Sequence, residues 1–193
     1  MMEVIRIAEL VDAAPVLAGA RSGAALFTKL AALLPPPRSS PEPLLLDFDG
    51  VELASASFLR ESIFPFKAFT RTARSAWYPV IANSSPDTLD ELEVVCSARA
   101  DSILVCVLSS KMKLSKVSLI GRLDGKQQDA YNFVVSSGGA TAKTLMEATA
   151  TPADASISPT AWNNRLSALV EKGVVAEVSA GRQKFYTPLV RCS

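Results

Sequence analysis

Histidine is absent from this 193-residue chain. Without an imidazole the chain lacks the base of Ser-His-Asp and Cys-His nucleophiles, and it has no histidine to bind a metal or carry a phosphoryl group. This absence excludes the commonest hydrolase centres and all histidine-ligated metal sites. We therefore expect a protein that is not an enzyme and that binds neither a metal nor another cofactor.

Cysteine is scarce, with Cys96, Cys106 and Cys192 as the three examples. Cys96 and Cys106 lie in apolar stretches and their spacing fits no metal site, so we expect buried, reduced thiols. No apolar run approaches the roughly 20 residues that span a bilayer, and the N-terminus lacks the pattern of a signal peptide. These features predict a soluble, cytoplasmic protein without membrane contact.

A surplus of one charge is also missing. Twenty Lys and Arg residues balance nineteen Asp and Glu residues, which leaves a net charge of +1. This balance excludes the broad positive field of a non-specific nucleic-acid coat, but it leaves DNA binding through one local patch open. Because 49% of the residues are hydrophobic, the chain has ample material for one large or two small cores.

The first part of the chain, residues 1–118, alternates strand and helix patterns, which is typical of an α/β domain. Short apolar runs predict strands covered on both faces, and amphipathic runs predict helices between them. We expect a mixed or parallel sheet with packed helices. The predicted strands are 4–10 (an edge strand), 44–48, 79–83 and 102–108; the helices are 22–34, capped by Ser22, 58–64 and 88–98. Residues 111–122 either add a strand or begin a linker.

Residues 47–61, DFDGVELASASFLRE, carry a more specific pattern. Together with the upstream Arg21-Ser22-Gly23, they resemble the STAS-like family of unknown function, which is related to the anti-anti-sigma factors. The resemblance covers roughly residues 4–110. It implies a regulatory domain that binds a protein partner, either an ATPase of the histidine-kinase-like class or another protein. The partner-binding residues that it implies are Asp47, Asp49, Ser55, Ser57 and Arg60.

In phosphorylated members of the STAS group, a serine at the start of a helix accepts the phosphate. By alignment this position is Ala56 here, between Ser55 and Ser57. We therefore favour partner binding without phosphorylation, with Ser55 or Ser57 capping the helix that follows. Phosphorylation of Ser55 or Ser57 is the alternative. Asp47 and Asp49 also permit a metal or an acid pair, although a polar strand end with a turn-forming aspartate explains them as well.

The second part, residues 119–193, has a different order of elements. Helical patterns at 124–137 and 141–148 precede a third helix, which Ser158 caps and Pro159 begins. Apolar residues of this third helix recur at helical spacing, and Gly173 ends it. Two strands, 174–179 and 184–189, then follow as a hairpin with its tip at residues 180–182.

This order and the run NRLSALVEKGVV before a Gly-Arg tip resemble the bacterial winged helix-turn-helix family. The resemblance implies double-stranded DNA binding, with the third helix in the major groove and the hairpin as the wing, plausibly in a homodimer. The implied DNA-binding residues are Lys143, Ser158, Thr160, Asn163, Asn164, Arg165, Arg182 and Lys184. From Leu123 onward, seven basic residues face six acidic ones. A winged helix that binds protein therefore stays the alternative, in a protein-protein adaptor.

A further basic stretch lies in the first part. Lys67, Arg71 and Arg74 follow helical spacing and alternate with aromatic residues. We interpret them as one solvent-exposed helix face, with contact to nucleic acid or to an acidic partner as the alternative.

Overall fold

The computed structural model describes residues 2–148, 158–180 and 183–190. The chain divides into two compact units, of which the first extends to Arg122 and the second spans Leu123–Leu189. The division falls after Arg122 rather than after residue 118, because the strand Leu114–Gly121 pairs with the sheet of the first unit. Residues 111–122 thus add a strand and are not a linker.

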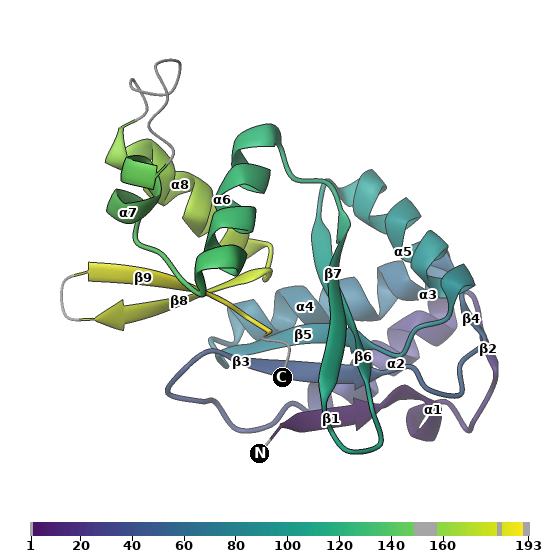
Figure 1. Ribbon diagram of the computed structural model, residues 1–193. Helices are drawn as coiled ribbons and strands as arrows, with labels where there is room; N and C mark the ends of the chain where they lie inside the picture. Colours follow the sequence, from purple (N-terminus) through teal and green to yellow (C-terminus); the bar gives the residue numbers. More distant parts are fainter. Residues whose placement is uncertain (1, 149–157, 181–182, 191–193) are drawn as a thin grey trace. The chain divides into compact units, whose positions relative to one another are not determined.

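The first unit contains a five-stranded sheet in the order β1-β3-β5-β6-β7 (Figure 1). Strands β1 (Glu3–Arg6), β3 (Glu42–Asp47), β5 (Trp77–Ala82) and β6 (Ser102–Leu108) are parallel, and β7 (Leu114–Gly121) is antiparallel to β6. This arrangement confirms the mixed sheet expected from the sequence. Continuous apolar runs form β3, β5 and most of β6, and the strand predicted at 102–108 has the expected bounds.

The two edges of the sheet are irregular. Strand β1 has only four residues, because Ile7–Leu10 forms the short helix α1 rather than prolonging the edge strand predicted at 4–10. At the other edge, the register between β6 and β7 shifts between Val105 and Val107. Lys116 of β7 has a backbone φ of +49°, which residues other than glycine rarely adopt in a strand.

Four helices lie on one face of this sheet: α2 (Ala20–Ala32), α3 (Ala56–Glu61), α4 (Ile63–Thr72) and α5 (Pro86–Arg99) (Figure 1). Their apolar sides and alternate residues of the strands form the core, with Leu44, Ile81 and Phe58 among its fully buried members. Strands β2 (Val16–Leu17) and β4 (Leu53–Ala54) pair with each other and form a short parallel ribbon beside the helices.

Two of the predicted helices differ from the structure. Helix α2 begins at Ala20 after Gly19, so Ser22 lies inside the helix and does not cap it. The helix predicted at 58–64 is divided at Ser62 into α3 and α4, and Pro65 is the third residue of α4, where a missing N–H is tolerated. The cap predicted for Ser55 is confirmed, since its hydroxyl accepts a hydrogen bond from the Phe58 N–H at 3.4 Å.

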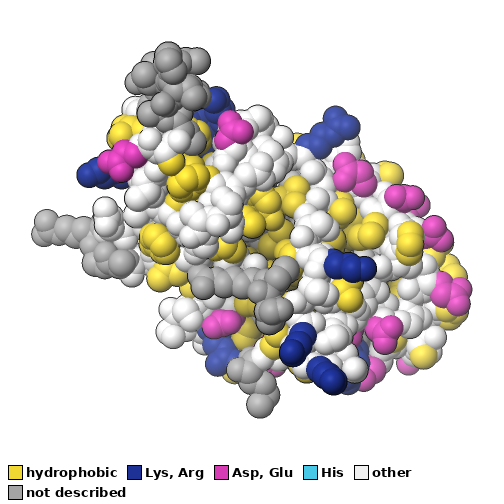
Figure 2. Space-filling view, in the orientation of Figure 1, with side chains coloured by type: hydrophobic (Ala, Val, Ile, Leu, Met, Phe, Trp, Pro, Cys, Tyr) yellow, Lys and Arg dark blue, Asp and Glu magenta, His cyan; other side chains and the backbone are white. Residues whose placement is uncertain are grey.

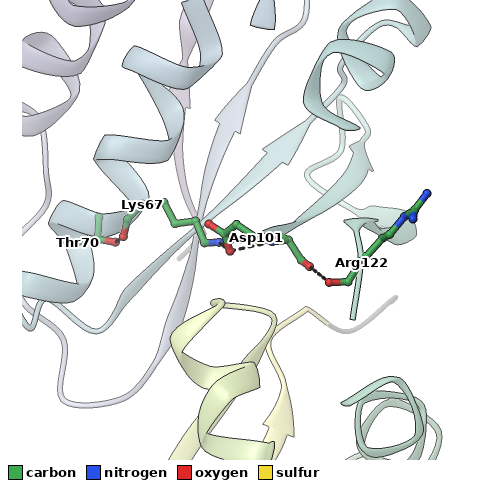
Figure 3. A network of polar contacts seen from close by, with 5 residues as sticks. Lys67, Thr70, Asp101 and Arg122 are labelled. Carbon is green, nitrogen blue, oxygen red and sulfur yellow. Dashed lines mark hydrogen bonds and ion pairs between the residues drawn. The ribbon is translucent and has the colours of Figure 1, made fainter. Parts of the chain in front are cut away.

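The expected basic face of Lys67, Arg71 and Arg74 is wrong for its first two members. Lys67 is only 5% exposed, and its ammonium donates to Asp101 Oδ1 and to the Ser102 carbonyl, each at 2.6 Å (Figure 3). The Arg71 guanidinium lies over the Tyr78 ring at 4.2 Å. Only Arg74 is exposed, so these residues tie α4 to the sheet rather than forming a basic surface.

The second unit contains α6 (Gly125–Ser137), α7 (Ala142–Ala148), α8 (Pro159–Glu171) and a hairpin of β8 (Val175–Ala180) and β9 (Gln183–Pro188) (Figure 1). Between α6 and α7, Ala140 pairs with Tyr186 of β9 through two backbone hydrogen bonds of 2.8 Å. Ala140 therefore acts as a third, one-residue strand beside β9.

Helix α8 follows the sequence prediction closely. Its cap is Ser158, whose hydroxyl accepts from the Ala161 N–H at 3.2 Å, and Pro159 is its first residue. Trp162, Leu166 and Leu169 are buried on one side, as their spacing predicts. Cys96 and Cys106 are both buried, as their apolar surroundings predict. Within the described ranges no helix has the length and apolarity needed to cross a membrane.

Candidate functional site

A polar cleft of about 300 Å³ lies at the carboxyl ends of the parallel strands in the first unit. In open α/β sheets this edge is where ligands and partners commonly bind. Two of the five predicted partner-binding residues, Asp47 and Asp49, line it. Arg6, Asn83 and Ser109 add a cation, an amide and a hydroxyl.

Asp47 organises this cleft. Its side chain is 7% exposed, and Oδ1 accepts from Asn83 Nδ2 at 2.9 Å and from the Asp49 N–H at 3.1 Å. The Asn83 amide oxygen in turn accepts from the Leu108 N–H at 2.9 Å. This chain of bonds links the ends of three neighbouring strands, so Asp47 orders the cleft while Asp49 is exposed for contact.

Ser55 and Ser57 lie at the start of α3 and do not line the cleft. Their hydroxyls are 3.1 Å apart. Helix α5 holds this segment by three bonds in succession: Ser85 Oγ donates to the Glu52 carbonyl at 2.6 Å, Thr88 Oγ1 accepts from Ala54 N–H at 2.9 Å, and the Glu91 carboxylate accepts from Ala56 N–H. The Glu91 carboxylate thus already accepts from the amide between Ser55 and Ser57, and its negative charge disfavours a phosphate on either serine.

Arg60 points elsewhere, since its Nε donates to the neighbouring Glu61 at 3.0 Å and its side chain is 52% exposed. Sequence reasoning missed Asn83, Thr88 and Glu91. Asn83 is the last residue of the strand predicted at 79–83, and strand ends at one edge of a parallel sheet come together, so its position was a usable signal. The pairing of Thr88 and Glu91 with residues some 35 positions earlier left no signal in the sequence.

In the second unit, a cleft of about 290 Å³ lies between the start of α7, the start of α8 and β9. Lys143, Asn163 and Lys184, all predicted to contact DNA, line it. Thr141 and Gln183 add further polar groups. The fold thus brings together three predicted residues, each of which lies about twenty positions from the next along the chain.

The two lysines of this second-unit cleft have acidic neighbours. Lys184 donates to Glu177 across the hairpin at 3.1 Å, and this hydrogen bond, with the charge of Glu177, raises the pKa of the Lys184 amine. Lys184 therefore stays protonated at neutral pH. Lys143 lies 3.8 Å from Glu147 on the same helix. Both lysines are exposed, so each can exchange its carboxylate partner for another anion.

The predicted groove-facing set of α8 does not share one side. Thr160 and Asn164 are exposed beside each other at a spacing of four residues, and Ser158 is exposed at the start of the helix. Arg165 is turned away from them: its guanidinium lies over the Trp162 ring at 4.8 Å, and its buried Nη1 has no hydrogen-bond partner among the described residues. Arg165 therefore packs against its own unit instead of joining Thr160 and Asn164. Arg182 lies outside the described residues.

Charges of both signs are mixed on the molecular surface, and in Figure 2 acidic side chains gather along α5. Asp87, Asp90 and Glu93 are the exposed acids of that helix. No group of three His, Cys, Asp or Glu side chains able to hold a metal ion occurs in the described part of the chain.

No protein-family model, no curated protein and no solved structure matches this chain.

Proposed function

We propose that this protein is a non-enzymatic, cytoplasmic regulator whose first unit is a STAS-like domain that binds a protein partner. Its second unit is a winged helix that binds double-stranded DNA as the output. The observation that carries the output is the second-unit cleft, which gathers Lys143, Asn163 and Lys184. Ammonium groups and an amide in one concave surface suit the phosphates and edges of a duplex.

The order of elements in the second unit supports this proposal. A helix, a one-residue strand at Ala140, two helices and a hairpin follow one another, and Ala140 pairs with β9. In winged helices this order presents the third helix and the hairpin on one side. Within Leu123–Leu189 six basic residues balance six acidic ones, so binding is expected to be weak in one copy and to need a homodimer for high affinity.

Charge reversal of the second-unit cleft tests DNA binding. We expect the double variant Lys143→Glu/Lys184→Glu to bind duplex DNA at least about tenfold more weakly than the unaltered chain at about 50 mM salt. The slope of log K against the logarithm of the salt concentration should also become less steep by about two, because two phosphate contacts are lost. Fluorescence anisotropy with a labelled duplex measures both quantities.

Lys116→Glu is the matched control, since Lys116 is exposed in β7 of the first unit. The same loss in this control would mean that only net charge matters. Absence of binding by the unaltered chain to any duplex at low salt would refute the DNA-binding output.

One observation favours the alternative, a protein-protein adaptor. The exposed side of α8 carries Thr160, Asn164 and Glu171, which include an acid and no cation. If α8 enters the major groove, Asn164→Arg adds a phosphate or base contact and strengthens duplex binding. If α8 docks on a protein, the same variant leaves duplex affinity unchanged.

The partner of the first unit is proposed to be an ATPase of the histidine-kinase-like class. We expect a basic side chain of that partner near Asp49, because this carboxylate is exposed at the cleft and forms no ion pair with another described residue. The test partner is an ATPase of this class encoded next to the gene of this protein. Asp49→Lys should weaken binding to that ATPase by about tenfold. Asp90→Lys on α5 is the control, and equal losses in both variants would argue against the cleft. Calorimetry with the two purified proteins gives the affinities.

A further inference from the structure

A second cavity of the first unit is separate from both clefts described above. It has a volume of about 300 Å³ and lies between the connection from α1 to β2 and helix α2. This volume is at the lower end of the range for pockets that hold small molecules. The cavity is open to solvent on one side, and none of its lining residues belongs to the two clefts described above.

The floor of this cavity is apolar. Leu17, Leu26 and Phe58 line it and belong to the core, with 4%, 1% and 1% of their surfaces exposed. Because core packing fixes all three side chains, the floor is rigid and already formed. Such a floor accepts the apolar part of a small ligand without rearrangement.

The rim of the cavity carries one charge of each sign. The Lys29 ammonium donates to the Leu10 carbonyl at 2.6 Å, which holds the cation at the rim and leaves two of its N–H donors for a ligand. Asp12 also lines the cavity, with a φ of +54°. Within the described ranges, neither Asp12 nor Lys29 forms an ion pair, with each other or with another residue.

We propose that this cavity binds a free α-amino acid with an apolar side chain. The side chain lies on the floor of Leu17, Leu26 and Phe58. The carboxylate accepts from Lys29, and the ammonium donates to Asp12. A ligand with only a carboxylate would pair with Lys29 but would bring a second negative charge close to Asp12. A ligand with only an amine would pair with Asp12 but would bring a second positive charge close to Lys29. The zwitterion satisfies both. The site lies outside the proposed partner and DNA surfaces and adds a small-molecule ligand to the regulator.

Isothermal titration calorimetry of the full chain tests this proposal with L-phenylalanine and L-leucine as probes. We expect saturable binding of at least one of them with one site per chain. Glycine should not bind, because it lacks the apolar part. For the amino acid that binds, the analogue without the ammonium and the analogue without the carboxylate should each bind about tenfold or more weakly.

Variants of the rim separate this site from non-specific binding. Lys29→Met and Asp12→Asn should each weaken binding about tenfold or more; Asn tolerates the backbone conformation of residue 12. Ala25→Trp, from an exposed position on α2 that lines the cavity, should abolish binding by filling it. Lys113→Met is the control, and circular dichroism checks that each variant folds. The proposal is overturned if neither amino acid binds at millimolar concentration, or if both rim variants bind with unchanged affinity.

Discussion

Lys67→Ala is expected to lower the free energy of unfolding of the first unit by about 3–5 kcal/mol. The substitution removes one member of a buried ion pair and leaves the other behind. Lys67 has 7% of its side chain exposed, and Asp101, its partner at 2.6 Å, has 25%. Figure 3 shows the lysine reaching from α4 to Asp101, immediately before β6. Without the ammonium, Asp101 and the Ser102 carbonyl lose a charged donor.

The two tryptophans allow each unit to be followed separately. Trp77 is buried in the first unit and Trp162 in the second. In a Trp162→Phe background, urea unfolding followed by tryptophan fluorescence reports the first unit alone. Lys113→Ala is the matched control and should stay within about 0.5 kcal/mol of the background. A loss below about 1 kcal/mol for Lys67→Ala would show that the ion pair does not hold the unit together.

The double variant Lys67→Met/Asp101→Asn provides a sharper comparison. It replaces the ion pair with an apolar side chain and a neutral amide of similar size. Replacing both members of a buried pair costs less than removing one, so this variant should be more stable than Lys67→Ala. The order reverses if Asp101 stabilises the unit mainly through contacts other than Lys67, such as the hydrogen bond that its Oδ1 accepts from the Ser102 N–H at 2.8 Å.

Gly23→Ala is the second substitution with a large expected effect. A Cβ atom at residue 23 would lie 2.4 Å from the Phe58 carbonyl oxygen and 3.1 Å from Glu61 Cβ, so α2 and α3 could not stay as close as they are. Alanine favours a helix by about 1 kcal/mol over glycine. We nevertheless expect a net loss of about 1–3 kcal/mol, because backbone atoms of α3 must move.

Gly125→Ala is the matched control for this glycine. A Cβ atom there has no neighbour within 4 Å, and Gly125 is the first residue of α6. The control should therefore be neutral or slightly stabilising when unfolding of the second unit is followed through Trp162. A stabilised Gly23→Ala variant would contradict the close approach of α2 and α3. This approach also gives a physical reason for the glycine in the Arg21-Ser22-Gly23 pattern.

Local patterns predicted much of the fold. The apolar run 102–108 became β6 without change, and Ser158-Pro159 begins α8 as its capping chemistry requires. The start of α2 was misplaced, because Gly19 precedes the helix in a conformation with φ of +86° that only the three-dimensional structure reveals. Helix periodicity placed the buried side of α8 correctly, but the stacking of Arg165 on Trp162 is a side-chain choice that periodicity does not encode.

The candidate sites were predictable only in part, for one physical reason. Asp47 and Asp49 lie where a strand ends, and the strand itself is evident from the sequence. The residues that position them, or that hold Ser55, come from distant segments: Asn83 is 36 positions from Asp47, and Glu91 is 35 positions from Ala56. The prediction that Lys67 is exposed was wrong for the same reason, since its partner Asp101 lies 34 positions further along the chain.

The irregular edges of the sheet limit how copies of this protein can associate. An open strand edge is a template for another chain, and regular edges lead to aggregation or to continuous sheets between subunits. Here β1 offers only four residues, and β7 combines a register shift with Lys116 in a backbone conformation that interrupts the ladder. Neither edge pairs easily with a second copy, so a homodimer of this protein should form through helices or the hairpin and leave the five-stranded sheet closed to extension.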